Sequence, residues 1–234
     1  MARKLLAEGI GTALLVAVVV GSGIAAQRLS PDDTGLQLLE NALSTALGLF
    51  VLVVVFQPIS GAHFNPVVSL VDAALGTRHW RDLGSYVPAQ LTGGVAGAVA
   101  ANAMFGLPLV QISENARWSW PHALAETIAT AGLVLVVFVL VRTKRAHWVG
   151  PAVGAYIGAA YFFTSSTSFA NPAVTVGRMF SNTFAGIEPW SALGFVLAQI
   201  AGGLLGLVLV RILAPTKTDG GADGNRTRVI SLED

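Results

Sequence analysis

The chain has 234 residues, none of them cysteine, and only 12% of them carry a charge. The absence of cysteine excludes disulfides, thiolate metal sites and a cysteine nucleophile. Charged residues are too few to cover a water-soluble surface, because 53% of the chain is hydrophobic. The composition therefore predicts an integral membrane protein.

Groupings of catalytic or metal-binding side chains are also missing. The four histidines lack the spacing of a metal site or of an acid–base pair. They are His63, His79, His122 and His147. The formal net charge is +1, and the basic residues are spread along the chain rather than gathered on one face. We therefore expect no enzyme activity, no cofactor, no metal and no nucleic-acid partner.

Six apolar segments are near the length that spans the hydrocarbon core of a bilayer. They cover residues 5–26, 38–56, 86–105, 123–141, 148–163 and 190–210. Two more, near residues 65–75 and 171–180, are too short to cross. The first segment carries Glu8 and lacks a clear cleavage pattern, which favours a retained helix over a signal peptide. The 26 glycines favour close packing between helices.

Lysine and arginine indicate which ends of the segments share a side. If the chain crosses the membrane six times, all the lysines and arginines lie on one side of the membrane except Arg28, Arg117 and Arg178. By the positive-inside rule, both termini are expected in the cytoplasm and the protein in the plasma or inner membrane. We expect one membrane domain over residues 1–214. The polar, glycine-rich tail 215–234 is expected to be disordered.

The two halves of the chain repeat one another, over about residues 5–105 and 121–213. Glu8 corresponds to Glu126, and Gln90 corresponds to Gln199 within matching Ala-Gln-x-x-Gly-Gly stretches. An Asn-Pro doublet lies between these landmarks in each half. Because each half has three spans, an odd number, the second half must be inverted in the membrane. The two short segments then enter from opposite faces.

Each Asn-Pro doublet opens one of the short segments. The first reads Asn65-Pro66-Val67 and the second Asn171-Pro172-Ala173. Proline at the first helical position loses no needed hydrogen bond, and the asparagine before it can cap the helix. Two such half-helices meeting tip to tip would direct both positive dipole ends to one point and repel cations. We expect the two asparagine amides to donate to a passing oxygen there, beyond their capping role.

These landmarks together resemble the aquaporin or major intrinsic protein superfamily. The first motif reads Ser60-Gly61-Ala62-His63-Phe64-Asn65-Pro66-Val67 and the second reads Ser168-Phe169-Ala170-Asn171-Pro172-Ala173. The resemblance implies an all-α membrane protein with six transmembrane helices and two re-entrant half-helices. It further implies a homotetramer with one narrow pore per subunit, and passive flow of water or small neutral solutes.

The resemblance also implies roles for the paired polar residues inside the spans. Glu8 and Glu126 would accept hydrogen bonds from the irregular backbone before each half-helix. Gln90 and Gln199 would be buried structural residues in paired positions. The alternative for the two glutamates is a proton relay, since ionisable residues in a membrane are often functional. His63 would either line the cytoplasmic half of the pore or cap a loop.

One position departs from the common family pattern. Most members have arginine three residues after the second motif's asparagine, whereas this chain has Val174. The other filter positions are expected at Thr45, at Ala159 or Phe162 in the fifth span, and at Ser168. A filter without arginine should be wider and less polar than that of a strict water pore, and should favour solutes with apolar surface.

Arg178 lies one helical turn beyond Val174 on nearly the same face. It could guard the outer mouth of the pore. Alternatively, it could extend to lipid headgroups or pair with Glu188.

We therefore expect a passive channel for polyols or metalloids, such as glycerol, arsenite and methylated arsenicals, together with water. The sequence Asn-Pro-Ala-Val-Thr in the second motif resembles the aquaglyceroporins associated with bacterial arsenic resistance. An orthodox water channel is the alternative. An ion-coupled transporter would need intramembrane charge partners, and the spans offer few beyond Glu8 and Glu126.

Overall fold

A computed structural model describes residues 1–216, and the rest of the expected disordered tail, 217–234, lies outside the described residues. Within them the chain is helical, with no strand. The six long helices are α1 (Ala2–Leu29), α2 (Thr34–Ser60), α4 (Trp80–Met104), α5 (Trp120–Arg142), α6 (Val149–Phe163) and α8 (Pro189–Leu213). The short ones are α3 (Pro66–Ala74), the 3-10 helix η1 (Ala146–Trp148) and α7 (Pro172–Arg178). The predicted all-α fold of six spans and two half-helices is confirmed.

Four of the long helices, α1, α2, α5 and α8, are long and apolar enough on their own to cross a membrane in the described part of the chain. Helix α4 has 25 residues but is interrupted by glycines and polar side chains. Helix α6 has 15 residues and spans about 22 Å at 1.5 Å per residue. The 3-10 helix η1 directly precedes α6 and extends it.

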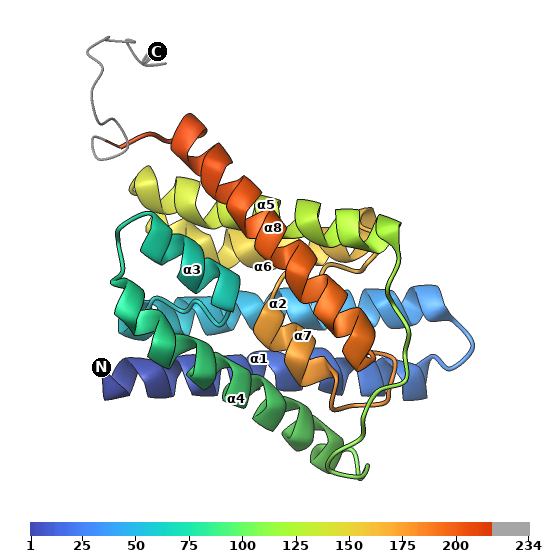
Figure 1. The fold of residues 1–234 in the computed structure, drawn as a ribbon. Helices are drawn as coiled ribbons and strands as arrows, with labels where there is room; N and C mark the ends of the chain where they lie inside the picture. The colour runs from blue at the N-terminus through green and yellow to red at the C-terminus, as the bar shows by residue number, and fades with distance from the viewer. Residues whose placement is uncertain (217–234) are drawn as a thin grey trace.

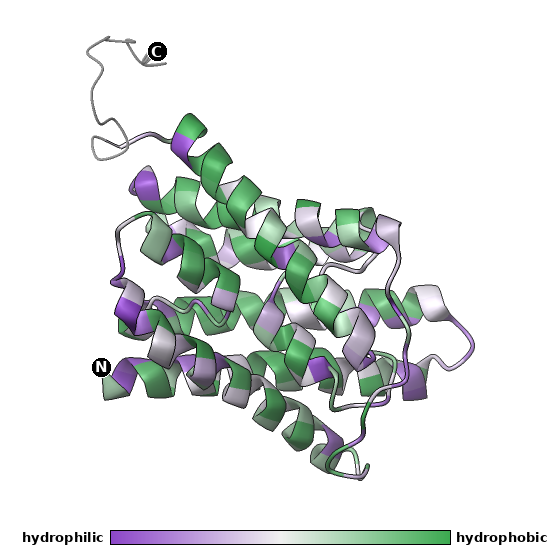
Figure 2. Cartoon of the chain, in the orientation of Figure 1, coloured by the Kyte–Doolittle hydropathy of each residue, from purple (hydrophilic) through white to green (hydrophobic). Residues whose placement is uncertain are grey.

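The outward faces of the bundle are apolar (Figure 2). On α2, for example, Leu43, Leu47 and Val51 follow one another at intervals of one turn and are each more than half exposed. Contiguous exposed apolar surface of this kind is unfavourable in water and matches a lipid environment. The inward faces bury aliphatic side chains together with polar groups that include Glu8, Asn65, Glu126 and Asn171.

The two halves pack their helices in the same way. Helix α1 contacts α4, and α5 contacts α8. A Cβ atom at Gly93 would meet the carbonyl oxygen of Gly9, and one at the repeat-equivalent Gly202 would meet that of Thr127. Glycine at these positions lets two helix backbones come close together, which supports cohesion inside a membrane.

The half-helices α3 and α7 lie inside the bundle and begin near one another (Figure 1). Helix α3 packs against α4 and α8, and α7 packs against α1, α4 and α8. The start of α1 and the end of α8 lie at the same end of the bundle. The bundle therefore surrounds two opposed helix N-termini at mid-depth.

Replacing Gly97 with valine tests the close approach of α1 and α4. Its Cβ would meet the carbonyl oxygen of Ala13, so we expect overpacking to cost about 2–3 kcal/mol. Thermal unfolding in detergent measures the loss. Gly84→Val in the same helix is the control, because no atom lies within 4 Å of its Cβ position. Equal melting temperatures for the two variants would contradict this packing account.

Candidate pore

The two asparagines cap the half-helices that follow them. The Asn65 Oδ1 atom accepts a hydrogen bond from the Val67 amide at 2.9 Å. The Asn171 Oδ1 atom accepts from the amides of Ala173 at 2.9 Å and Val174 at 3.3 Å. Each cap stands directly before a proline at the first helical position, as the sequence pattern predicts. Capping thus occupies the amide oxygen and leaves the amide N–H groups free for other contacts.

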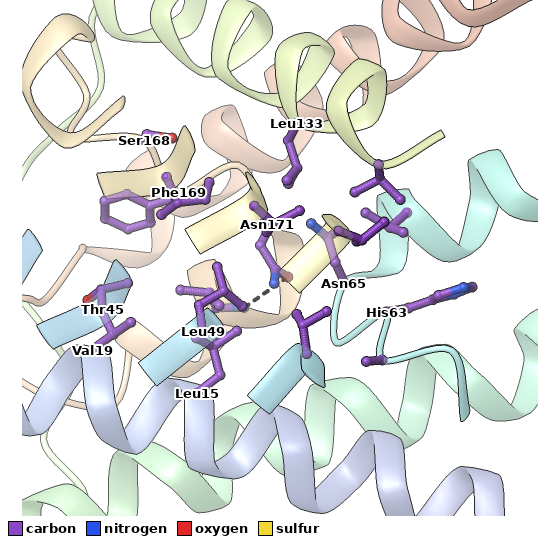
Figure 3. Close-up of a pocket in the computed structure, with 18 of the residues that line it drawn as sticks. Leu15, Val19, Thr45, Leu49, His63, Asn65, Leu133, Ser168, Phe169 and Asn171 are labelled. Carbon is purple, nitrogen blue, oxygen red and sulfur yellow. Dashed lines mark hydrogen bonds between the residues drawn. The ribbon is translucent and has the colours of Figure 1, made fainter. Parts of the chain in front are cut away.

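Each asparagine also reaches across to the other half of the chain. The Asn65 Nδ2 group donates to the Ala170 carbonyl, and the Asn171 Nδ2 group donates to the Phe64 carbonyl, both at 2.8 Å. This reciprocal pair of bonds joins the two half-helix tips. An amide NH2 has two N–H groups, so each asparagine has a second donor left. Both asparagines line the central cavity (Figure 3).

The loops that lead into the half-helices hold an unusual backbone conformation. Ala62 and Phe64 have φ of 50°, and the repeat-equivalent Ser168 and Ala170 have φ of 49° and 48°. Residues with a side chain pay an energetic cost in this left-handed region, so surrounding contacts must hold them there. Irregular backbone at membrane depth must also find hydrogen-bond partners within the protein.

Glu8 supplies those partners for the first loop. Its Oε1 atom accepts from the Ser60 hydroxyl at 2.6 Å and the His63 amide at 3.0 Å. Its Oε2 atom accepts from the Phe64 amide at 2.7 Å and from Gln90 Nε2 at 2.8 Å. Four donors therefore surround one fully buried carboxylate.

Glu126 repeats this arrangement for the second loop. Its Oε1 atom accepts from the Ser166 hydroxyl at 2.6 Å and the Phe169 amide at 2.9 Å. Its Oε2 atom accepts from the Ala170 amide at 2.9 Å and from Gln199 Nε2 at 2.7 Å. Neither glutamate lines the cavity. This geometry favours the structural role over the proton relay.

A central cavity runs past the asparagines between the helices. Aliphatic side chains of α1, α2, α5 and α6 form one wall, including Leu15, Leu49, Leu133 and Ile157. Polar groups lie mainly on the loops and at the tips of the half-helices, including His63, Asn65, Ser168 and Asn171 (Figure 3). A solute inside would meet both aliphatic side chains and hydrogen-bonding groups.

Three of the four expected filter positions lie on this cavity. Thr45, Ser168 and Val174 are buried and line it. Val174 has a counterpart in Val68, which follows Asn65 by three residues and also lines the cavity. Neither half-helix therefore presents a charged side chain at this position.

The fourth position requires a correction. Ala159 and Phe162 do not line the cavity, and Phe162 is 55% exposed on the outer surface of α6. Tyr161 lines the cavity instead, and its hydroxyl lies 3.1 Å from Thr45 Oγ1. One residue along a helix rotates a side chain by about 100°, so an error of one or two positions turns the side chain away from the cavity. The buried spacing Val153, Ile157, Tyr161 is the helical signal that could have found it.

His63 lines the cavity and is held by two neighbouring side chains. Its Nδ1 atom lies 3.0 Å from Ser69 Oγ, and its Nε2 atom lies 3.4 Å from Asp72 Oδ2. Arg78 Nε donates to the same Asp72 oxygen at 3.0 Å. The histidine thus lines the cavity in an anchored orientation, and the sequence analysis did not identify Asp72 or Arg78 as its support.

Helices with apolar outer faces that surround an internal cavity lined by two asparagines define a membrane channel. The chain belongs to the major intrinsic protein family, whose sequence profile, described as Major intrinsic protein, matches residues 1–168. The resemblance seen in the motifs is confirmed, and proteins of this family are channels rather than enzymes.

Similar proteins extend the match beyond that profile. The chain is 46% identical over 220 residues to the aquaglyceroporin AqpS of Rhizobium meliloti (strain 1021), covering 93% of each chain. It is 34% identical over 210 residues to aquaporin NIP1-3 of Oryza sativa subsp. japonica, covering 86% of this chain and 71% of that one. The X-ray structure of the aquaglyceroporin from Plasmodium falciparum superposes with a TM-score of 0.70 at 22% identity. That superposition covers 92% of this chain and 97% of the other, and it supports the fold.

Replacing Glu126 with alanine tests its anchoring role. Four buried donors would lose their acceptor, at about 1–3 kcal/mol for each unsatisfied group, so little folded protein should remain. Glu126→Gln keeps one acceptor oxygen but places an NH2 group against donors that need an acceptor. Its stability should therefore lie between that of the wild type and that of Glu126→Ala. The yield of folded protein and thermal unfolding in detergent measure this order of stability. A well-folded Gln variant without transport, together with wild-type flux that titrates with pH, would indicate a proton relay instead.

Proposed function

We propose that this channel passes small neutral solutes, with polyols and uncharged metalloid hydroxides as its preferred solutes and water alongside them. Glycerol, arsenite and methylated arsenicals belong to this group. The observation that carries this proposal is the makeup of the cavity lining at the expected filter, which we call the constriction and which combines three hydroxyls with an aliphatic side chain. These residues are Thr45, Tyr161, Ser168 and Val174.

The hydroxyl groups of this constriction suit a polyhydroxylated solute. Thr45 and Tyr161 hydrogen-bond to one another, which fixes both hydroxyls at the wall. Ser168 Oγ is buried and has no hydrogen-bond partner within the described residues. Buried polar groups rarely stay unpaired, so this hydroxyl is available to a passing solute.

The aliphatic side of the constriction suits the other face of the same solute. Val174 carries no donor or charge, so a solute that presents carbon there leaves no polar group unpaired. A ring of strong donors would instead favour water over larger molecules. The name of the bacterial relative, aquaglyceroporin, is consistent with this preference.

The setting of the channel is also part of the proposal. We place it in the plasma or inner membrane with both termini in the cytoplasm, because the start of α1 and the end of α8 share one end of the bundle. Most lysines and arginines map to that end by the six-span order. The homotetramer implied by the family resemblance remains part of the proposal, and cross-linking in native membranes would test it.

A panel of uptake measurements in proteoliposomes tests the proposed solutes. Water, glycerol and arsenite should each enter faster than in empty liposomes. Imposing a proton or sodium gradient should leave the rates unchanged, because passive flow has no coupling ion. Water entry alone would support the orthodox water channel, and gradient-driven accumulation would support a coupled transporter.

The substitution Val174→Arg should narrow the constriction and add donors to it. We expect glycerol and arsenite uptake to fall about tenfold or more, which corresponds to about 1.4 kcal/mol, and water flux to fall less. Stopped-flow measurements on vesicles with equal protein content provide the comparison. Val174→Leu is the matched control, because it adds bulk without charge. Equal effects on all three solutes in both variants would contradict a filter role for this position.

A further inference from the structure

Arg178, at the last position of α7, is buried with 2% exposure and lines the cavity. Its guanidinium carbon lies 3.4 Å from the centroid of the Phe169 ring, and its Nε group donates to the Ala185 carbonyl. It does not extend to the surface, and Glu188 instead accepts from the Ser191 hydroxyl at 2.8 Å. The guanidinium is therefore a fixed part of the outer pore wall.

The internal repeat gives Arg178 a counterpart of opposite charge. Asp72 follows Asn65 by seven residues, as Arg178 follows Asn171. The contacts are equivalent too, because His63 and Phe169 each stand two residues before their asparagine. His63 lies against Asp72, whereas Phe169 lies against Arg178. The two half-helices thus end in opposite charges at opposite ends of the pore.

Only one of these two charges is neutralised by its neighbours. The Asp72 carboxylate has the Arg78 guanidinium at 3.0 Å and the His63 ring at 3.4 Å. Within residues 1–216, no carboxylate forms an ion pair with Arg178. The Glu126 carboxylate uses both oxygens for the second loop and Gln199. A buried charge without a counter-ion is costly. The Phe169 ring, the Ala185 carbonyl and the contents of the cavity must therefore stabilise the Arg178 charge.

A second arginine holds the same loop without reaching the cavity. Arg117 donates to the carbonyls of Phe184 and Gly186, both at 2.7 Å, on either side of the Ala185 carbonyl that Arg178 uses. Its guanidinium carbon also lies 5.7 Å from the Phe169 ring centroid. Three consecutive carbonyls and one aromatic ring therefore fix the two guanidinium groups, of which only Arg178 lines the pore.

We propose that Arg178 is the specificity-determining cation of the outer pore and that Phe169 is its positioning residue. Its charge repels cations, and its remaining N–H groups donate to solute oxygens. Arg178 lies four residues beyond Val174, about 6 Å along the helix. The charge is thereby separated along the helix from Val174, so the constriction itself carries no charged side chain. The solute part of this inference rests on the proposed function.

Ion conductance in planar bilayers tests the proposal. Arg178→Met should raise potassium conductance at least about tenfold and shift the reversal potential in a salt gradient toward cations. Arg178→Lys, which keeps the charge, should restore most of the barrier. Arg117→Met is the matched control, because it loosens the same loop and should leave ion exclusion intact. A merely structural Arg178 would give no rescue by lysine.

Two outcomes would overturn the proposal. One is a folded Arg178→Met variant with wild-type ion exclusion and wild-type glycerol flux, and the other is equal leak in the methionine and lysine variants. If Arg178→Met fails to fold, Phe169→Leu replaces it and should give a smaller leak, whereas no leak would count against the proposal. A failure of the proposed function can be told apart from a failure of this inference, because the wild type would then pass water but no glycerol.

Discussion

The reciprocal hydrogen bonds between the two asparagine tips are the contact on which the rest of this structure depends. Asn65 donates to the carbonyl of Ala170, and Asn171 donates to that of Phe64. They can form only because Glu8 and Glu126 hold the preceding loops in a left-handed conformation. Without these anchors, unpaired backbone groups would lie at membrane depth, where water cannot replace the lost bonds.

The inverted repeat explains both the symmetry of the centre and the asymmetry of the ends. Caps, anchors and close glycine contacts occur twice, and valine follows each asparagine by three residues. The two half-helix ends differ, because Arg78 and His63 neutralise Asp72, whereas Arg178 contacts the Phe169 ring and the Ala185 carbonyl and has no carboxylate partner within residues 1–216. In our proposal, a central zone without charge is combined with a positive outer entrance, and this combination suits uncharged solutes.

The sequence was sufficient to predict the helices but not the direction in which every side chain points. Apolar runs and the Asn-Pro doublets define all eight predicted segments, since length and capping are local properties. The fifth-span filter residue was missed because helix rotation depends on tertiary packing, and Tyr161 rather than Ala159 or Phe162 faces the cavity. The stack of Arg178 on Phe169 joins a loop to a half-helix end, and no sequence spacing reveals it.

Cation conductance of the Asn171→Asp variant tests the central claim most directly. A carboxylate cannot donate to the Phe64 carbonyl, and it adds negative charge where two helix dipoles now repel cations. The account predicts increased cation leak together with reduced glycerol flux. Asn182→Asp, an exposed loop position, is the control for the charge change alone. A folded Asn171→Asp channel with unchanged ion exclusion and unchanged glycerol flux would contradict the account.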